Sequence, residues 1–271
     1  MSNELEAFLE YIQVTKALSV KSVEAYRSDL LQIETLTKKP LISLDTNATL
    51  KALSSYENKR TLNRKLSAIN AFFSFCFRSE FVQEQQKLKL AKIPKNLPKF
   101  LTYKQIKEGV QSIDQSEWIG QRDAALIMFL YATGMRISEC LAMRLEDIEG
   151  TWLRVRHGKG DKERFIPIAK EALALLQCYL STVPFDTQEI WLNYKGASLS
   201  RISAFKITQK YLGISPHVLR HSYATALILG GADLRVVQEL LGHASLLTTQ
   251  VYTHIQKQNL QDTVRNHHPM A

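Results

Sequence analysis

Residues 240–254 have the sequence LLGHASLLTTQVYTH, and this stretch decides how the C-terminal half of the chain is organised. It starts at the end of an apolar helical pattern, and Gly242 can adopt the left-handed backbone conformation that ends many helices. His243 follows directly, and Tyr252 lies nine residues further along the chain. The stretch predicts a helix end that carries a histidine, followed by a tyrosine that is either a reactive group or a core residue.

A helix with polar residues on one face is predicted just before it, in SPHVLRHSYAT at residues 215–225. Pro216 suits the first turn of a helix. His217 and Arg220 are three residues apart and therefore share one face. His221 lies on a different face, where we expect a structural role. A histidine and an arginine on one face can bind a phosphate and exchange a proton with a nucleophile, although such pairs also occur by chance.

Two further segments place a cation at the edge of a secondary-structure element. ATGMRISE, at residues 132–139, has Arg136 at the start of a helix. The planar guanidinium can grip a phosphate there, or it can form a surface ion pair with Glu139 one turn later. In HGKGDKER, at residues 157–164, the first seven residues are predicted to form a hairpin turn with Lys159 at its tip. This lysine either reaches into the groove of a partner or is simply solvated.

The chain of 271 residues is long enough for two domains. We assign a helical domain to residues 1–83, a basic linker to residues 84–100 and a mixed domain to residues 101–271. Pro94 and Pro98 interrupt the helical pattern at this boundary.

The first domain is predicted to be a four-helix bundle. Its helices begin near Leu5 and Ser19 and then cover about Thr46–Tyr56 and Lys59–Arg78. Apolar residues recur at the spacing of one-sided helices. The expected inward residues are Leu5, Phe8, Leu9, Ile12, Val23, Tyr26, Leu30, Ile33, Leu62, Leu66, Ile69, Phe73 and Cys76.

The second domain is predicted to be mainly α-helical with a small β-hairpin, so the fold class is mainly α. The hairpin strands are Trp152–Arg156 and Arg164–Ile168. The other expected elements are helices over Gln121–Ala132, Ile137–Arg144 and Lys170–Thr182, a short strand over Ile190–Asn193, and four or five helices after Ser200.

The charge of the chain favours a polyanionic partner. Its net charge is +9 and its pI is about 9.4. Residues 84–104 alone hold six lysines and one acidic residue, which suits a clamp around a duplex or a solvated linker. The acidic N-terminus is unlike a secretory signal, and no stretch is long enough to cross a bilayer. Cys76, Cys140 and Cys178 lack metal-ligand spacing, so we expect three buried thiols in a cytoplasmic protein.

Taken together, the segments ATGMRISE, GKGDKER, HVLRHSYAT and LLGHASLLTTQVYTH resemble the boxes of the tyrosine recombinase (phage integrase) family in order and spacing. Arg136 and Lys159 are 23 residues apart, as are Arg220 and His243. SVKSVEAYRSDL and TLNRKLSAINAFFSFC resemble the N-terminal core-binding domain of that family. The compact length and the ending HHPMA are most similar to the Xer recombinases of bacteria and archaea.

The resemblance implies an active site of six residues, namely Arg136, Lys159, His217, Arg220, His243 and Tyr252. In this interpretation Tyr252 attacks the scissile phosphate and forms a 3′-phosphotyrosine. Arg136 and Arg220 stabilise charge on the non-bridging oxygens.

The remaining residues handle protons and orientation. Lys159 protonates the leaving 5′-oxygen, His217 accepts the tyrosine proton, and His243 donates a hydrogen bond to the phosphate. Helical spacing suggests that Glu139 orients Arg136. The chemistry implied by the resemblance needs no cofactor and no metal.

The implied partners are double-stranded DNA with a specific target site and further copies of the chain, which form a tetramer on two duplexes. An activating cell-division partner is a further candidate, and no membrane is involved. Chromosome-dimer resolution through a Holliday junction is the expected role. A mobile-element integrase or invertase and a DNA-relaxing enzyme like type IB topoisomerases are the alternatives. We expect a C-terminal helix over Ile255–Arg265, with Leu260 and Val264 on one face, that docks on a neighbouring subunit.

Overall fold

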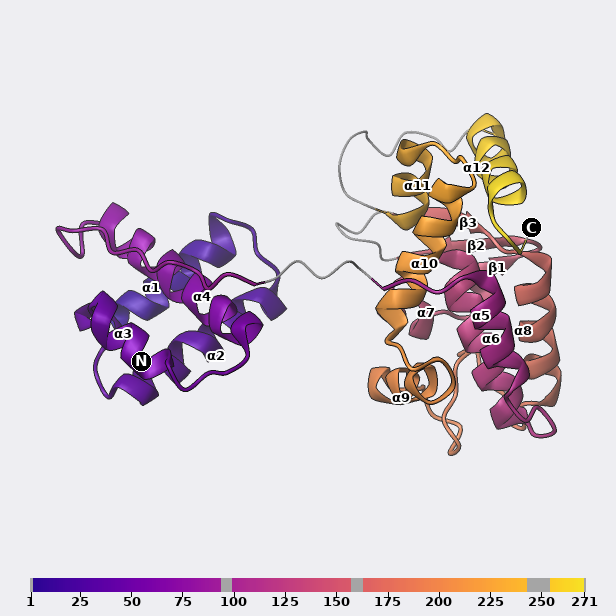
Figure 1. The fold of residues 1–271 in the computed structure, drawn as a ribbon, viewed down its shortest axis with the longest axis horizontal. Coiled ribbons are helices and arrows are strands. Elements are labelled where there is room, and N and C mark those ends of the chain that lie inside the picture. Colours follow the sequence, from indigo (N-terminus) through magenta and orange to yellow (C-terminus); the bar gives the residue numbers. More distant parts are fainter. Residues whose placement is uncertain (1, 94–98, 157–162, 243–253, 271) are drawn as a thin grey trace. The chain divides into compact units, whose positions relative to one another are not determined.

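The computed structural model describes residues 2–93, 99–156, 163–242 and 254–270, except for the side chains of residues 254–260. The chain divides into two units, Met1–Asn96 and Leu97–Ala271, each with its own hydrophobic core (Figure 1). Both units consist mainly of helices, so the predicted fold class is confirmed.

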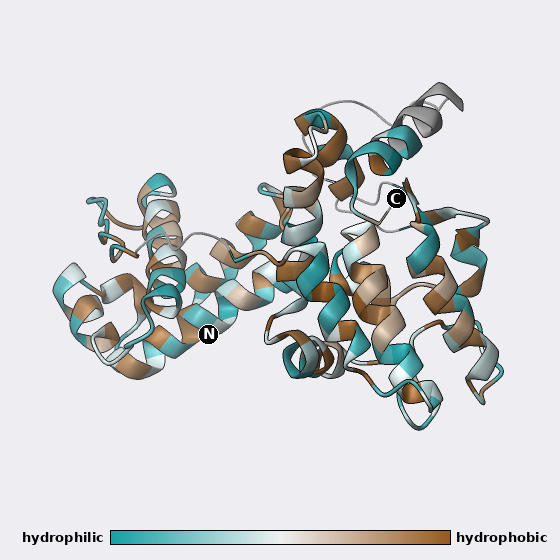
Figure 2. Ribbon diagram, turned by 45° about the vertical axis from the view of Figure 1, so that its right-hand side comes forward, coloured by the Kyte–Doolittle hydropathy of each residue, from teal (hydrophilic) through white to brown (hydrophobic). Residues whose placement is uncertain are grey.

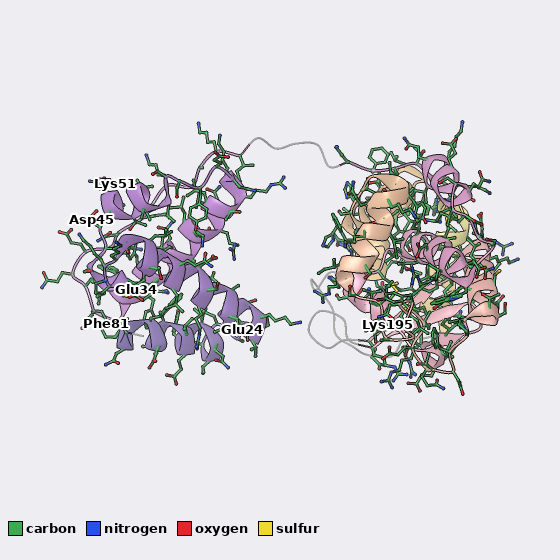
Figure 3. All side chains as sticks on the ribbon, turned by 90° about the horizontal axis from the view of Figure 1, so that it is seen from below. Glu24, Glu34, Asp45, Lys51, Phe81 and Lys195 are labelled. Atoms are coloured by element: carbon green, nitrogen blue, oxygen red, sulfur yellow. The ribbon has the colours of Figure 1, made fainter. Side chains whose placement is uncertain are left out.

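Within the described residues, four α-helices and one 3-10 turn make up the first unit. These are α1 (Asn3–Val14), α2 (Val20–Thr37), η1 (Leu41–Ser43), α3 (Thr46–Leu53) and α4 (Lys59–Arg78). A side chain caps the start of each α-helix by accepting a backbone N–H bond; the caps are Ser2, Ser19, Asp45 and Asn58. Figure 3 shows Asp45 and Lys51 at α3, where each charge lies at the helix end that it stabilises.

The predicted inward face of the bundle is confirmed. Its expected residues are buried except for Tyr26 and Leu62, which are half-buried. Hydrophilic and hydrophobic residues alternate along these helices in Figure 2, as expected for helices with one face in a core.

An ion pair inside this bundle was not anticipated from the sequence. Lys65 on α4 is buried, and its Nζ lies 3.0 Å from Oδ1 of Asp29 and 2.5 Å from Oε1 of Gln32, both on α2. Arg64 also contacts Asp29, at 2.8 Å. Because an unmatched buried charge costs several kcal/mol, the cluster favours the one register of α2 on α4 in which these charges meet.

Part of the range expected to be a linker packs against the first unit. Leu88 is buried in its core. The Asn70 amide bonds the N–H and the carbonyl of Leu88 at 2.8 and 2.9 Å. The Asn63 side-chain amide likewise forms hydrogen bonds with the N–H and the carbonyl of Ala91, at 2.7 and 2.8 Å. Two asparagine side chains on α4 thus satisfy an extended backbone that has no strand partner.

The second unit surrounds one apolar helix with seven others and a small sheet, within the described residues. The helices are α5 (Tyr103–Gln111), α6 (Trp118–Thr133), α7 (Ile137–Leu141), α8 (Lys170–Thr182), α9 (Arg201–Leu212), α10 (Pro216–Leu229), α11 (Leu234–Leu241) and α12 (His254–His267). From Arg122 to Thr133 every residue of α6 is buried, and α6 packs against α8 and α10. Such a helix has no face left for solvent and forms the centre of the domain.

The sheet is antiparallel with the order β1-β2-β3. Its strands are β1 (Ile148–Glu149), β2 (Trp152–Val155) and β3 (Arg164–Pro167), and a 3-10 turn, η2 (Leu145–Asp147), precedes them. Both hairpin strands were predicted to within one residue, and α8 matches its predicted bounds. Neither α5 nor β1 was predicted.

Two sequence predictions are wrong. The segment Ile190–Asn193 is no strand and makes only an isolated bridge, Leu192 to Ser198. Its apolar character reflects burial, since Trp191 stacks on Tyr179 with ring centroids 6.0 Å apart. Cys178 is exposed, whereas Cys76 and Cys140 are buried as expected. The inner face of α8 carries Ala172, Leu176 and Tyr179, and position 178 points away from it.

The end of the chain belongs to the core of its own domain. Helix α12 packs against α10, α11 and β3. Val264, His268 and Met270 are buried. The His268 ring lies between Tyr131 of α6 and Tyr223 of α10, at centroid distances of 4.9 and 5.1 Å. These contacts lie within one protomer, so docking of α12 on a neighbouring subunit stays a prediction. The Leu260 side chain lies outside the described residues.

None of the helices in the described part of the chain combines the length and the apolarity that crossing a membrane would require.

Burial of His268 predicts an acid-sensitive stability. Burial lowers the pKa of His268 from 6.5 to about 4. Between these values the unfolded chain binds a proton that the folded chain refuses, so stability falls as the pH drops from 6.5 to 4. Over this window the loss reaches roughly 3 kcal/mol. In urea titrations at several pH values, His268→Phe should lose this part of the pH dependence.

Tyr131→Phe is the matched control, because it changes a ring in the same cluster and keeps the imidazole. It should retain the wild-type pH dependence. Equal slopes for His268→Phe and wild type would contradict a neutral buried imidazole.

Candidate active site

A tight turn after α6 positions Arg136. Gly134 ends α6 with a φ of +59°, a conformation that favours glycine. A Cβ at this position would lie 2.3 Å from the Tyr223 ring, so the turn also leaves no room for a side chain. The chain then reverses into α7, with Arg136 as the residue that precedes its first turn.

Glu139 holds Arg136 through both its backbone and its side chain. The Arg136 backbone N–H donates to Oε2 at 2.9 Å, and Nη1 donates to Oε1 at 2.7 Å. The predicted contact is present, but it is no surface pair, because the Glu139 side chain is only 6% exposed. Arg136 itself is 29% exposed and can still reach a ligand.

A third residue, Arg164 at the start of β3, completes this cluster. Its Nη2 donates to Oε2 of Glu139 at 2.7 Å and its Nη1 to Oε1 at 3.2 Å. Burial by itself raises the pKa of the Glu139 carboxyl. The hydrogen bonds and charge of Arg164, with the bonds from Arg136, outweigh burial and hold this pKa below its ordinary value. Glu139 is therefore ionised at neutral pH.

Arg220 of α10 approaches the same region and is held by backbone carbonyls. Its Nη1 donates to the Gly134 carbonyl at 2.7 Å and its Nη2 to the Leu241 carbonyl at 2.6 Å. Burial and the charge of Arg136 lower the pKa of Arg220 to about 10, with Glu139 acting in the opposite direction. Arg220 thus remains a cation at neutral pH.

The end of α11 connects these arginines. Arg136 Nη2 donates to the Gly242 carbonyl at 3.3 Å, and Arg164 Nε donates to the Leu240 carbonyl at 3.2 Å. With the bond from Arg220 to Leu241, the three consecutive carbonyls of residues 240–242 each accept a hydrogen bond from a different arginine. Gly242 ends α11 with a φ of +65°, as the sequence predicted, and His243 is the next residue of the chain.

The two histidines of α10 occupy different surroundings. Pro216 is in the first turn, as predicted, and His217 is exposed one turn before Arg220. His221, next to Arg220, is half-buried. The structure therefore brings Arg136 and Arg220 together. His217 lies on α10, as Arg220 does, and is exposed to solvent.

Three of the predicted site residues, Lys159, His243 and Tyr252, lie outside the described residues. Their neighbours are described. Val155 and Arg164 are paired across β2 and β3, so the two strands that flank the Lys159 segment lie side by side at Arg164. Helix α12 begins at His254, two residues after Tyr252.

The cluster concentrates positive charge. Arg136, Arg164 and Arg220 contribute +3 and Glu139 contributes −1, which gives +2 for this group of side chains. Such an arrangement suits an anionic oxygen group such as a phosphate. The described residues contain no group of three or more His, Cys, Asp or Glu side chains placed to hold a metal ion.

Comparison with family models decides the classification. The phage integrase family model matches residues 99–259, and the model of the phage integrase N-terminal SAM-like domain matches residues 5–80. This chain belongs to the phage integrase family of tyrosine recombinases. These enzymes break and rejoin DNA, and the resemblance inferred from the sequence is confirmed.

The similarity extends over the whole recombinase. The chain is 37% identical to tyrosine recombinase XerC of Bacillus subtilis, over 100% of its own length and 98% of the relative. It is 33% identical to tyrosine recombinase XerD of a Staphylococcus epidermidis strain, over the full length of both. A solved structure of the XerH recombinase on a palindromic difH substrate is 26% identical, with a TM-score of 0.65 over 96% of this chain and 83% of that one.

Arg164 is a feature of this recombinase to which the sequence prediction gave no role. A signal for it was available. Alternation along a strand places residue 164 on the same face as Ile166, which is buried. A charged residue on the inward face of a strand requires a buried partner of opposite charge, and Glu139 is that partner.

Proposed function

We propose that this recombinase cuts and rejoins DNA at a specific site through a 3′-phosphotyrosine at Tyr252. One observation carries the proposal. Arg136 and Arg220, 84 residues apart in the sequence, converge on the carbonyls of Leu241 and Gly242, directly before His243. Two cations are thus fixed beside the segment that leads to the tyrosine.

The two arginines would bind the non-bridging oxygens of the scissile phosphate. Negative charge accumulates on these oxygens when a fifth oxygen approaches phosphorus. Donors that are already in place stabilise this charge without reorganisation. A guanidinium also offers two parallel N–H groups, which fit two phosphate oxygens.

Proton transfer would fall to His217 and Lys159. Tyr252 Oη forms the new bond to phosphorus, the bond to the 5′-oxygen breaks, and the number of phosphoester bonds is unchanged. His217 accepts the phenol proton and Lys159 gives a proton to the 5′-oxygen. A free tyrosine has a pKa of about 10, so the reaction at neutral pH needs both the base and nearby cations. His243 would donate a further hydrogen bond to the phosphate.

Recombination between two duplexes sets the number of protomers. Four strands must be cut, and each protomer has one Tyr252, so we propose a tetramer and a Holliday-junction intermediate. We propose resolution of chromosome dimers as the role, because the Xer resemblance of the sequence implies it and full-length relatives carry the names XerC and XerD. The net charge of +9 supports DNA as the partner.

The target sequence can be found by selecting bound duplexes from random DNA. Recombination between two copies of the selected duplex should follow, at a rate that EDTA leaves unchanged. Relaxation of plasmids that lack any such sequence, without recombination of those that carry it, would instead favour a topoisomerase-like enzyme.

Tyr252→Phe should bind the selected duplex normally and form no covalent adduct, because phenylalanine keeps the ring and lacks the attacking oxygen. The measurement uses a nicked duplex whose short leaving fragment diffuses away, so that the adduct accumulates on a denaturing gel. An adduct in Tyr252→Phe, or a peptide map that places the DNA on another residue, would refute the assignment.

Arg136→Ala and Arg220→Ala should each slow cleavage by roughly 10²–10³-fold, the usual loss for one transition-state donor. Affinity for the duplex should change far less, because many other cations contribute phosphate contacts. Single-turnover rates at saturating protein test this expectation. Lys195→Ala, which removes an exposed cation (labelled in Figure 3), is the control and should cleave at the wild-type rate. Equal losses of affinity and rate would make the arginines ordinary binding residues.

Lys159→Ala should cleave an ordinary site slowly and a site with sulfur in place of the 5′-bridging oxygen almost as fast as wild type. A thiolate leaves without a proton, so the general acid becomes unnecessary. Cleavage rates on the two duplexes give the comparison. Without rescue by sulfur, Lys159 is not the acid, and Lys162 in the same turn becomes the next candidate.

A further inference from the structure

Arg164 joins three segments that carry proposed catalytic residues. It starts the strand that follows the segment containing Lys159. It binds the carboxylate that holds Arg136, and its Nε donates to Leu240, three residues before His243. Its side chain is 5% exposed, so it is a poor candidate for binding DNA directly.

The fit around Arg164 is specific for a guanidinium. Two parallel N–H groups meet the two Glu139 oxygens while the third nitrogen reaches the Leu240 carbonyl. Gly242 packs directly on this group, since a Cβ there would lie 3.0 Å from Arg164 Nη1. A lysine offers no planar fork and cannot make these contacts together.

The charge of Arg164 also affects how Glu139 acts on Arg136. Each Glu139 oxygen accepts one bond from Arg136 and one from Arg164. Without Arg164, the carboxylate would be matched by Arg136 alone and would cancel its charge. The group Arg136, Arg220 and Glu139 would then carry +1, from two cations and one anion.

From these contacts we infer that Arg164 is a positioning residue that balances Glu139 and so leaves the charge of Arg136 available for the scissile phosphate. Arg164 touches no substrate in this assignment and acts through Glu139 and Arg136. The inference rests on the proposed function, because it requires Arg136 to neutralise a phosphate.

A methylphosphonate at the scissile position tests this role. A methyl group replaces one non-bridging oxygen there and removes the negative charge that Arg136 would neutralise. For each protein the single-turnover cleavage rate is measured on the selected duplex with phosphate and on the same duplex with methylphosphonate. The readout is the ratio of the two rates within one variant, which a lower folded fraction does not change.

Relative to wild type, Arg164→Met should lower the ratio of the phosphate rate to the methylphosphonate rate by roughly 10- to 100-fold, in the same direction as Arg136→Ala. Adding Glu139→Gln to Arg164→Met removes the uncompensated negative charge. The double variant should cleave the duplex with phosphate about tenfold faster than Arg164→Met does. Arg164→Lys keeps the charge without the fork and should fall between wild type and Arg164→Met.

Arg122→Met is the matched control. Arg122 is another buried arginine, with bonds to the Asp123 carboxylate and the Leu192 carbonyl. It lies roughly 16 Å along α6 from the end that leads to Arg136. Its loss should lower the thermal unfolding temperature and leave the rate ratio at the wild-type value.

The outcomes separate this inference from the proposed function. A wild-type ratio in Arg164→Met, with a lowered ratio in Arg136→Ala, would make Arg164 structural only and overturn the inference alone. A wild-type ratio in Arg136→Ala, or no Tyr252 adduct in the wild type, would overturn the proposed function and the inference with it.

Discussion

The rest of the site depends on one interaction, the binding of the Glu139 carboxylate between Arg136 and Arg164. It lies where α7 begins, and a buried anion there is tolerated only if cations match it. Arg136 comes from the same turn and Arg164 from the sheet, so the match is made only when β3 lies close enough to α7 for Arg164 to reach Glu139. The position of β3 in the small sheet and the geometry of the site are therefore linked through one ion pair.

A second constraint lies beneath the site, where Gly134, Tyr223 and His268 meet. The Tyr223 ring fills the space that a side chain at position 134 would need, and it also packs against the His268 imidazole. Tyr223 lies on α10, three residues after Arg220. The last residues of the chain therefore support the helix that carries Arg220, one of the two cations proposed to bind the phosphate. Removing them would expose the core and would also delete the helix predicted to dock on a neighbouring subunit.

Much of this arrangement could be predicted from the sequence, because local rules govern it. Apolar spacing gave the α1–α4 bundle, the Pro216 start and Gly242 end were visible as single residues, and the order of the motifs indicated the family. Contacts distant in sequence were not predictable in this way. The Lys65–Asp29 pair was not anticipated, Cys178 was expected to be buried, and Arg164 was placed at the start of a strand without a role in the site. For each of these residues, the packing of another element decides the surroundings of the side chain.

The groups that hold each arginine determine how much of its positive charge remains available to a ligand. Carboxylates fix a guanidinium firmly but cancel its charge, whereas carbonyl dipoles fix it and leave the charge intact. Arg220 is held by the Gly134 and Leu241 carbonyls. Arg136 is held by Glu139, and Arg164 supplies the compensating cation. Both routes keep two cations rigid and leave the group with a net positive charge. A site of this kind binds best the anion whose charge increases during the reaction, and a phosphate under attack is such an anion.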